Sequence, residues 1–595
     1  MKNALWLISL CFFAAGALAP RYRDKSLPVR ERVDDLVERM TVEQKVGQLL
    51  HPWNPGGTPE SVFSAYGGSG LGACYLFWAT NATTAEGMLA DRNRLQKMFV
   101  EGSPFGIPVS IVMESLHGGG FGGTLFPMPV NFAATFNLSL ARQAYRLVGV
   151  DARVRGCDRC FSPVVNIFQD ARYGRLAEGF SEDPWVTTAF GLAIVDAMQG
   201  GQGGGPEAYL KSSDFDVTCT VKHFAGYGRG TGGIDGSPAM VSPQVLNEVY
   251  LRPWKALADA GLLRSVMAAQ NAVNGVPMHS NANLLNATLR GAWGVSRALV
   301  ESDGLDCIGA LVDFRVAANR SDAAILAVSA GMDQDLGAAT LPTLTAAVAA
   351  GQVAEDVISR AAAHVLTQKF ASGLFDQPYA NPAFLNESTL DPPASRQLAR
   401  EAAQQSITLL LNRNATLPLA LVPGVSRVAV LGVNAASEDA LKGGYAQDGQ
   451  RMVTVLAAFQ AALGEASVPF AVGADPDAKA QNATRLAEAV ALARGSDAVV
   501  LVLGDSLTTC GEMYDSSSLE LPGAEQVELL KAIVALSPHV PVVVVSGEPF
   551  GPPPPYCPPL QAQPACALAL TPPSPPPRPP SAFPTSHRSS FTRAR

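Results

Sequence analysis

Between about residue 65 and residue 375, short apolar runs alternate with longer stretches in which apolar residues recur at helical spacing. The runs have the length of strands, and the amphipathic stretches include 138–150, 184–198, 243–260 and 321–330. Alternation of strands and helices predicts a mostly parallel sheet with helices packed outside it. A closed, TIM-like (β/α)8 barrel suits a segment of this size, because such barrels typically take about 250 residues or more.

Several of the apolar runs stop at a polar or ionisable residue. The run that begins at Ala298 reaches Glu301 and is followed by Asp303 and Gly304. A carboxylate at the end of a buried strand is costly to desolvate unless it has a partner or a task. Other predicted strands end in the same way, at Glu114, at Lys222-His223, at Gln270-Asn271 and, after the run 160–166, at Asp170 and Arg175. Barrel strands converge at their C-terminal ends, so this pattern predicts a site there.

A second α/β unit follows a segment that holds Pro378, Pro382, Pro392 and Pro393 and has few periodic apolar positions. Such a composition is typical of a linker. Beyond it, buried-strand candidates alternate with predicted helices at 452–463, 483–494 and 523–536; the strand candidates are 428–432, 498–504 and 540–546. The expected domains are a barrel over 20–375, a linker over 376–400 and an incomplete α/β sandwich over 401–550.

The two ends of the chain differ from the rest. Residues 1–19 combine Lys2, an apolar stretch and the small residues Ala17 and Ala19, which is the pattern of a secretory signal peptide; the alternative is an uncleaved interfacial anchor. We therefore expect a secreted protein with no membrane segment after signal cleavage. Residues 551–595 are rich in proline and of low complexity, and we expect a disordered tail because they bury too little apolar area to fold alone.

Export would also permit glycans and disulfides. Asparagine stands two positions before Ser or Thr at Asn81, Asn137, Asn286, Asn319, Asn386, Asn414 and Asn482, which favours a glycosylated surface. Cys157 and Cys160 form a C-x-x-C pair without a second Cys or His pair, so a short-loop disulfide or plain buried thiols are favoured over zinc.

Composition narrows the class of function. Apolar residues make up 47% of the chain and charged residues 16%, which is ample for a large core. The net charge of −8 argues against a nucleic-acid binder, which would show a basic footprint. A mildly acidic protein fits a neutral, polar substrate.

Taken together, short motifs over residues 28–548 resemble family 3 of the glycoside hydrolases, most closely its plant and fungal β-xylosidase type. The motifs are Met40–Leu49, Met113–Gly118, Ser162–Phe168, Arg172–Arg175, Glu182–Pro184, Val221–Phe224, Asn271–Pro277, Ser302–Gly304, Leu409–Asn412 and Leu521–Gly523. Their number and order make the resemblance specific. It implies a TIM-like barrel followed by an α/β sandwich, an active site between them, and no metal or cofactor.

The resemblance also implies roles for individual residues. Asp303 would be the nucleophile, and the groups that hold the hydroxyls of the terminal sugar would be Glu114, Arg175, Lys222 and His223. A general acid/base would come from a variable loop of the second domain. We align that loop with Thr509–Asp515 and choose Glu512, with Asp505 and Glu520 as competitors.

Glycosidic cleavage by retention needs an ionised carboxylate for attack and a protonated carboxyl for the leaving oxygen, about 5–5.5 Å apart. We expect neighbouring cations such as Lys222 to keep Asp303 ionised by lowering its pKa. Glu512 should be drier and further from cations, which would raise its pKa. Lys222 and His223 are adjacent in sequence, so both can face one substrate only if the strand bends or bulges there.

Each assignment has a simpler alternative. Glu114 and Arg175 would form a buried ion pair that holds the barrel. His117 and His223 would be hydrogen-bonded core histidines, and Asp183-Pro184 would only begin a helix. Taken alone, Asp303 is as well explained as a cap.

The chain departs from the family pattern at four positions and at its end. Gln270 stands where Tyr is common, Gly304 where Trp or Cys follows the nucleophile, and Ser516 where Arg is usual. Gly304 would remove an aromatic wall for the next sugar, whereas Glu114, longer than the usual Asp, would crowd the C6 arm of a hexose and favour pentoses. Relatives continue with further sandwich strands, so we expect unpaired sheet edges.

The leading hypothesis, which follows from the resemblance, is a secreted, retaining exo-β-glycosidase that releases terminal β-xylosyl residues from an oligosaccharide or cell-wall glycan through a glycosyl-aspartate intermediate. The alternatives are a β-glucosidase of the same family, an N-acetylhexosaminidase, which we disfavour, and a non-catalytic sugar-binding remnant.

Overall fold

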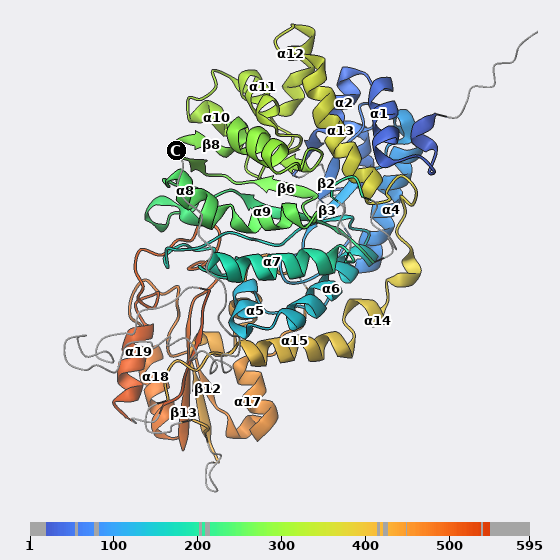
Figure 1. Cartoon of the computed structure of the whole chain (residues 1–595). Helices are drawn as coiled ribbons and strands as arrows, with labels where there is room; N and C mark the ends of the chain where they lie inside the picture. The colour runs from blue at the N-terminus through green and yellow to red at the C-terminus, as the bar shows by residue number, and fades with distance from the viewer. Residues whose placement is uncertain are drawn as a thin grey trace, which may run out of the picture. The chain divides into compact units, whose positions relative to one another are not determined.

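The computed structural model describes residues 20–53, 57–75, 82–201, 205–208, 215–412, 417–419, 426–447, 449–536 and 540–547. The expected signal peptide, the sequons at Asn81 and Asn414 and the proline-rich tail lie outside these residues. Figure 1 shows the arrangement of the described elements.

Parallel strands form the first domain. Six of them pair in the order β2-β3-β4-β5-β6-β9, while β10 pairs with β1 and is bridged to β9 at Glu301 and Gln334. The strands are β1 (Leu50–His51), β2 (Ala73–Tyr75), β3 (Ser110–Glu114), β4 (Arg159–Phe161), β5 (Thr218–Phe224), β6 (Ser265–Ala268), β9 (Leu299–Glu301) and β10 (Asp335–Leu336). In the described part of the chain the strands therefore follow one another in the order of a TIM-like barrel, as predicted.

Helices cover the outside of the strands (Figure 1). They are α1 (Val29–Arg39), α2 (Val42–Gln48), α3 (Pro59–Tyr66), α4 (Ala85–Gly102), α5 (Pro129–Thr135), α6 (Leu138–Val154), α7 (Pro184–Met198), α8 (Pro243–Val245), α9 (Arg252–Asp259), α10 (Ala310–Asp313), α11 (Arg320–Ala330), α12 (Leu344–Ala349) and α13 (Glu355–Ala371). Successive residues of a strand pack into two different hydrophobic clusters, because their side chains point to opposite faces of the sheet. One cluster contains Tyr75, Val112 and Phe161. The larger cluster, which includes the helices, contains Cys74 and Ile111. Thr41 forms the predicted capping box with Gln44 at the start of α2.

An ion pair lies among the strands. Glu301, at the end of β9, accepts from the Arg159 guanidinium and, at 3.3 Å, from the Thr220 hydroxyl. Arg159 also donates to the Gln334 side chain at 2.8 Å. Glu301 therefore has its charge and hydrogen-bond partners within the barrel. Asp303 lies beyond the end of the strand.

The second domain has three layers. Its parallel sheet has the order β12-β11-β13-β14, with β11 (Val428–Leu431), β12 (Phe470–Ala471), β13 (Ala498–Gly504) and β14 (Val542–Val545). One face packs against α18 (Ala483–Arg494) and α19 (Gln526–Val534), and the other packs against α17 (Val455–Leu463) (Figure 1). A short α16 (Glu438–Lys442) follows β11. This agrees with the α/β sandwich predicted from the sequence.

Two local expectations differ from the structure. The predicted linker carries α14 (Glu387–Leu390) and the beginning of α15 (Pro393–Ser406), so it is partly helical. The strand predicted over 160–166 ends at Phe161, because Pro163 has no N–H to donate to the neighbouring strand.

Apolar side chains are exposed at Ile407, at Leu409–Leu411 and along β14.

Four of the described sequon asparagines begin helices. Asn137, Asn319, Asn386 and Asn482 are N-caps whose Oδ1 atoms accept backbone N–H groups. Helix capping therefore gives these motifs a structural explanation that does not need glycans.

Candidate active site

Asp303 follows β9 and is buried. Its Oδ1 accepts from the Gly304 N–H at 2.8 Å, whereas its Oδ2 has no hydrogen-bond partner among the described residues. Burial raises the pKa of Asp303 to about 6, and Glu512 also raises it; Arg175 and Lys222 act against this. The cations lower this pKa, as expected, but the expected net decrease is wrong, because the effect of desolvation is larger.

Lys222 lies on β5 and forms an ion pair with a different carboxylate. Its ammonium donates to both oxygens of Glu114, at 2.9 and 3.1 Å, and both side chains are buried. Burial raises the pKa of Glu114 to about 7 although Lys222 lowers it. The β5–β6 register shifts between Val221 and Phe224, which is the irregularity that adjacent Lys222 and His223 require to share one site.

His223 lies beside Asp303, with its Nε2 at 3.7 Å from Asp303 Oδ2. Burial, Arg175 and Lys222 hold the pKa of His223 well below its usual value, so the ring is neutral. The Asn166 amide accepts from the His223 backbone N–H at 3.0 Å and donates to His223 Nδ1 at 3.1 Å. The other ring nitrogen, Nε2, faces both Asp303 and the Arg175 guanidinium, which lies 3.4 Å away.

Arg175 connects the barrel residues to the second domain. It donates to both oxygens of Glu178 at 2.8 Å and to Glu512 Oε1 at 3.1 Å. Its guanidinium also lies 3.4 Å from His223 Nε2. A Glu114–Arg175 ion pair, the simpler alternative, is wrong, because Glu114 pairs with Lys222 and Arg175 pairs with Glu178 and Glu512.

Glu512 comes from the loop after β13, and its side chain is 31% exposed. The Tyr445 hydroxyl donates to its Oε2 at 2.5 Å, and Gln270 lies 3.5 Å from its Oε1. Glu512 is therefore ion-paired with Arg175 rather than remote from cations, which corrects the expectation above. Both of its oxygens accept hydrogen bonds, one from Arg175 and one from Tyr445.

The Glu512 loop is fixed on the barrel. Asp515 accepts from the backbone N–H of Gly174 at 2.9 Å and of Asp235 at 2.7 Å. A Cβ at Gly174 would lie 2.4 Å from the carbonyl oxygens of Gly511 and Tyr514, so only glycine allows this approach. The loop therefore presents Glu512 to the barrel in one position.

Among the described residues, the hydrogen bonds given for Asp505 and Glu520 go to groups other than the barrel carboxylates. Asp505 is buried and accepts from the Ser546 hydroxyl, and Glu520 is exposed. The geometry thus brings together Asp303, Glu512, Glu114, Arg175, Lys222 and His223, the set predicted from the sequence, and leaves out Asp505, Glu520 and Asp170. Asp170 pairs with its neighbour Arg172.

Three residues of the site carried no sequence prediction. Tyr445 contacts Glu512 and lies under Lys222, whose Nζ is 4.7 Å from its ring centroid. Glu178 orients Arg175, and Asn166 orients His223. For Tyr445, the preceding Gly443-Gly444 indicates a loop, but no sequence pattern marks Glu178 or Asn166 as site residues.

Other polar candidates are structural. His117 is buried with both ring nitrogens against backbone carbonyls, those of Phe126 and Gly444. Asp183 is the N-cap of α7, as the simpler alternative proposed. Cys157 and Cys160 are buried free thiols whose sulfurs lie 3.7 Å apart.

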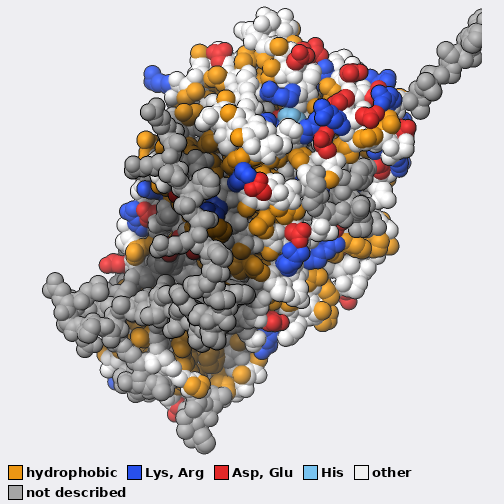
Figure 2. Space-filling model, in the orientation of Figure 1, with side chains coloured by type: hydrophobic (Ala, Val, Ile, Leu, Met, Phe, Trp, Pro, Cys, Tyr) orange, Lys and Arg blue, Asp and Glu red, His pale blue; other side chains and the backbone are white. Residues whose placement is uncertain are grey.

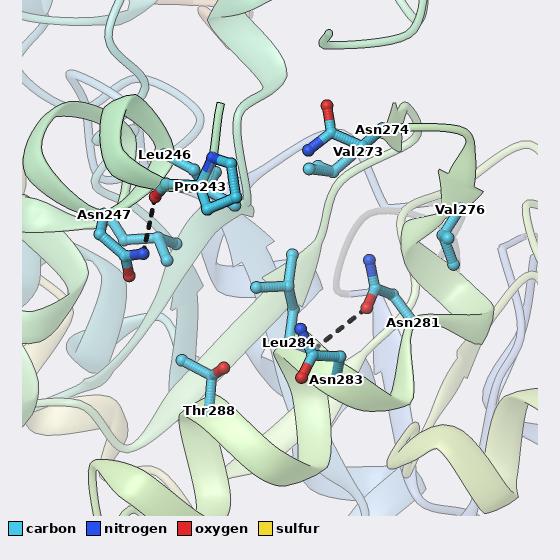
Figure 3. Close-up of a pocket in the computed structure, with 11 residues that line it drawn as sticks. Pro243, Leu246, Asn247, Val273, Asn274, Val276, Asn281, Asn283, Leu284 and Thr288 are labelled. Carbon is cyan, nitrogen blue, oxygen red and sulfur yellow. Dashed lines mark hydrogen bonds between the residues drawn. The ribbon is translucent and has the colours of Figure 1, made fainter. Parts of the chain in front are cut away.

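A pocket lies away from these residues. Figure 3 shows a pocket of about 270 Å³ beside the hairpin of β7 (Ala272–Val273) and β8 (Val276–Pro277), lined by amides such as Asn274 and Asn281. It contains neither Asp303 nor Glu512.

No cluster of metal-binding side chains occurs within the described residues, and none of their helices is long and apolar enough to cross a bilayer. The face in Figure 2 carries acidic and basic side chains intermingled.

Comparison with known proteins gives two family matches. Residues 41–368 match the glycosyl hydrolase family 3 N terminal domain, and residues 407–555 match the family 3 C-terminal domain.

Individual relatives agree with these matches. The chain is 31% identical over 569 residues to the periplasmic beta-glucosidase of Salmonella typhimurium, covering 90% of this chain and 70% of the relative. It is 35% identical over 470 residues to a beta-xylosidase of Formosa agariphila, covering 75% of this chain and 63% of the relative. A solved β-glucosidase from Erythrobacter marinus superposes with a TM-score of 0.81 at 33% identity, covering 90% and 74% of the two chains. The chain thus spans about two thirds of these relatives' length.

Proposed function

The chain belongs to glycosyl hydrolase family 3, and from this membership we propose that it is a secreted, retaining exo-β-glycosidase that releases terminal β-D-xylosyl residues from xylo-oligosaccharides. Asp303 is the nucleophile and Glu512 the general acid/base. The observation that carries the proposal is the buried Asp303 oxygen without a hydrogen-bond partner, within electrostatic reach of Glu512 from the second domain.

In the first step, Asp303 Oδ2 attacks the anomeric carbon and the bond to the leaving oxygen breaks. Above pH of about 6 the carboxyl is ionised, as a nucleophile requires. The neutral His223 lies beside Asp303 and adds no full positive charge to the site. Glu512 gives a proton to the leaving oxygen in the same step.

A general acid needs a protonated oxygen, and both Glu512 oxygens accept hydrogen bonds in the free protein. Substrate binding therefore has to release Glu512 from Arg175 or from Tyr445. Sugar hydroxyls are suitable replacements, because they both donate and accept. In the second step Glu512 takes a proton from water, which attacks the anomeric carbon and releases Asp303.

The buried polar groups would hold the sugar. Glu114 accepts and Lys222 donates, so the pair can bind adjacent hydroxyls, and Arg175 supplies further donors. Glu114 is longer than Asp and leaves less room for a C6 arm, which favours xylose. β-Glucosidase activity is the second candidate, because relatives with this name match most of the chain.

The test compares aryl β-xylosides and β-glucosides with good and poor leaving groups. Asp303→Ala should lose turnover of all of them. Glu512→Ala should keep turnover of the best leaving group, which needs no proton, and lose that of the poorest. Unchanged turnover in Asp303→Ala would falsify the nucleophile assignment, and a larger loss on β-xylosides than on β-glucosides in Glu114→Asp would support the pentose preference.

A further inference from the structure

The pocket in Figure 3 lies among three segments of the first domain and contains none of the candidate catalytic residues. The segments are 243–251, the β7–β8 hairpin and 281–288. They line it with Pro243, Leu246, Asn247, Leu251, Val273, Asn274, Val276, Asn281, Asn283, Leu284 and Thr288. Its volume of about 270 Å³ equals that of about nine water molecules, at about 30 Å³ each. The pocket therefore has room for a ligand of the size of one sugar ring.

The lining of the pocket is uncharged. The 11 lining residues, all of them in the described part of the chain, include no acidic, basic or histidine side chain. A charged ligand would lose its hydration on entering and would gain no opposite charge in return. The lining thus disfavours phosphates, carboxylates and cations and favours a neutral ligand.

The buried residues of the lining are mainly apolar, and its exposed residues are mainly amides. Leu251 and Leu284 are buried, whereas Asn247, Asn274 and Asn283 are exposed. Aliphatic side chains suit the C–H groups of a ligand, and a side-chain amide can both donate to and accept from a hydroxyl. A sugar ring carries both kinds of group.

Hydrogen bonds within the lining set the direction of two amides. Asn281 Oδ1 accepts from the Leu284 N–H at 3.1 Å, and Asn247 Nδ2 donates to the Pro243 carbonyl at 2.7 Å (Figure 3). Asn281 then offers its amide N–H groups to a ligand, and Asn247 offers its oxygen. Asn281 Nδ2 lies 3.9 Å from Met278 Sδ, which is a weak acceptor and leaves that donor available.

The hairpin holds a further amide in place. Val273 pairs with Val276, and the two residues between them, Asn274 and Gly275, have φ of 50° and 84°. A two-residue turn with positive φ at both positions is a tight connection that Asn-Gly favours. Asn274 Oδ1 accepts from the Val241 N–H at 2.9 Å, so its amide N–H groups are a second set of donors.

Two π-helical segments occur in the described part of the chain, and both line this pocket. They are Leu246–Tyr250 and Asn283–Ala292. In the second, the Trp293 N–H donates to the Thr288 carbonyl at 3.0 Å, five residues back. Such wide turns are rare and occur frequently at functional sites. Their presence in two walls of one pocket indicates that the pocket has a task of its own.

We propose that this pocket is a second carbohydrate site, which binds one neutral pentose or hexose ring apart from the candidate catalytic acids. The proposal goes beyond the proposed function, because binding here needs no bond cleavage and none of the catalytic residues. A single sugar ring has few atoms to bury, so its Kd should be on the order of millimolar.

The experiment follows the methyl group of Met278 by NMR, in the full chain labelled with carbon-13 at its methionine methyls and assigned with Met278→Leu. Xylose and glucose, added up to about 100 mM, should shift this signal until it saturates, because that range exceeds the expected Kd. Glucuronate should bind at least about tenfold more weakly, since the lining offers no cation. An unchanged Met278 signal, or equal responses to glucuronate and glucose, would overturn the proposal.

Two variants test the position of the ligand. Asn283→Phe puts a ring at an exposed edge of the pocket and should abolish the response to xylose, whereas Ala346→Phe, on the exposed side of α12, is the matched control and should keep it. Val276→Lys adds a cation at a lining residue that is 44% exposed and should strengthen glucuronate binding about threefold to fivefold. A full response to xylose in Asn283→Phe, or unchanged glucuronate binding in Val276→Lys, would contradict the proposed site.

A second methionine separates this proposal from the proposed function. Met267 packs inside the barrel in the cluster that contains Tyr75, whose hydroxyl accepts from the Glu114 N–H, so it reports on the candidate active site. A xylose response at Met267 without one at Met278 would leave the catalytic site and reject the second site. A Met278 response in a protein that hydrolyses no glycoside would refute the proposed function and support the second site.

Discussion

Replacement of Asp303 by Asn should abolish turnover and stabilise the fold. Asn keeps an oxygen for the Gly304 N–H and is nearly isosteric, but it carries no charge. The pKa of Asp303 rises from 3.8 to about 6 on folding, mainly through burial, so the native state disfavours the ionised form. A shift of about 2 units corresponds to about 3 kcal/mol, which is the upper limit of the gain at neutral pH.

The pH dependence of this gain has a definite sign. Below pH of about 4 Asp303 is protonated in both the folded and the unfolded state, and the two proteins should be equally stable. The penalty of ionising the buried carboxyl appears as pH rises from about 4 to about 6 and is complete above that. Urea unfolding at pH 7.5 and at pH 4 measures the difference.

Asp333→Asn is the opposite control. Asp333 is also buried, but its pKa is lowered: Arg290 and His364 outweigh the opposing effect of burial. Its substitution should destabilise the protein at neutral pH. If Asp303→Asn is no more stable than wild type at pH 7.5, or if its gain is the same at both pH values, the burial argument is refuted.

Three further predictions concern the same site. On the acid side, kcat/KM should fall with a midpoint near pH 6, because attack needs ionised Asp303; a profile flat down to pH 4 would contradict this. Gly174→Ala should lower kcat at least tenfold while the melting temperature changes little, because a Cβ there pushes the Glu512 loop away; kinetics of this variant beside Gly444→Ala, which has open space, measure the effect. Lys222→Met should destabilise the fold by about 3–5 kcal/mol at pH 7.5, since it leaves Glu114 buried without its cation; urea unfolding tests it, and the Lys222→Met, Glu114→Gln double variant should recover part of the loss.

Elements with strong periodicity could be predicted from the sequence. The helix expected over 483–494 is α18, Ala483–Arg494, because its apolar spacing and its Asn482 cap agree. The six residues expected at the site do lie together, because strand ends of a barrel converge and motifs occurred in a recognisable order. Local patterns sufficed wherever the signal lay within one strand or helix.

Contacts between distant segments could not be predicted. Tyr445 stands in a glycine-containing loop with no periodic signal, and its role depends on how that loop approaches Glu512 and Lys222. The pKa of Asp303 depends on the balance between burial and charge, which composition does not give. Trp53 lies against Gly304 across about 250 residues of chain, and no local pattern predicts a contact over that separation.

The most direct test of the central claim is to trap the intermediate. Incubation with an activated 2-deoxy-2-fluoro β-xyloside or β-glucoside should leave one sugar on the protein, and peptide mapping by mass spectrometry should place it on the peptide that contains Asp303, with Asp303→Asn unlabelled. A label on another residue, or turnover of this substrate in Asp303→Asn, would contradict the account.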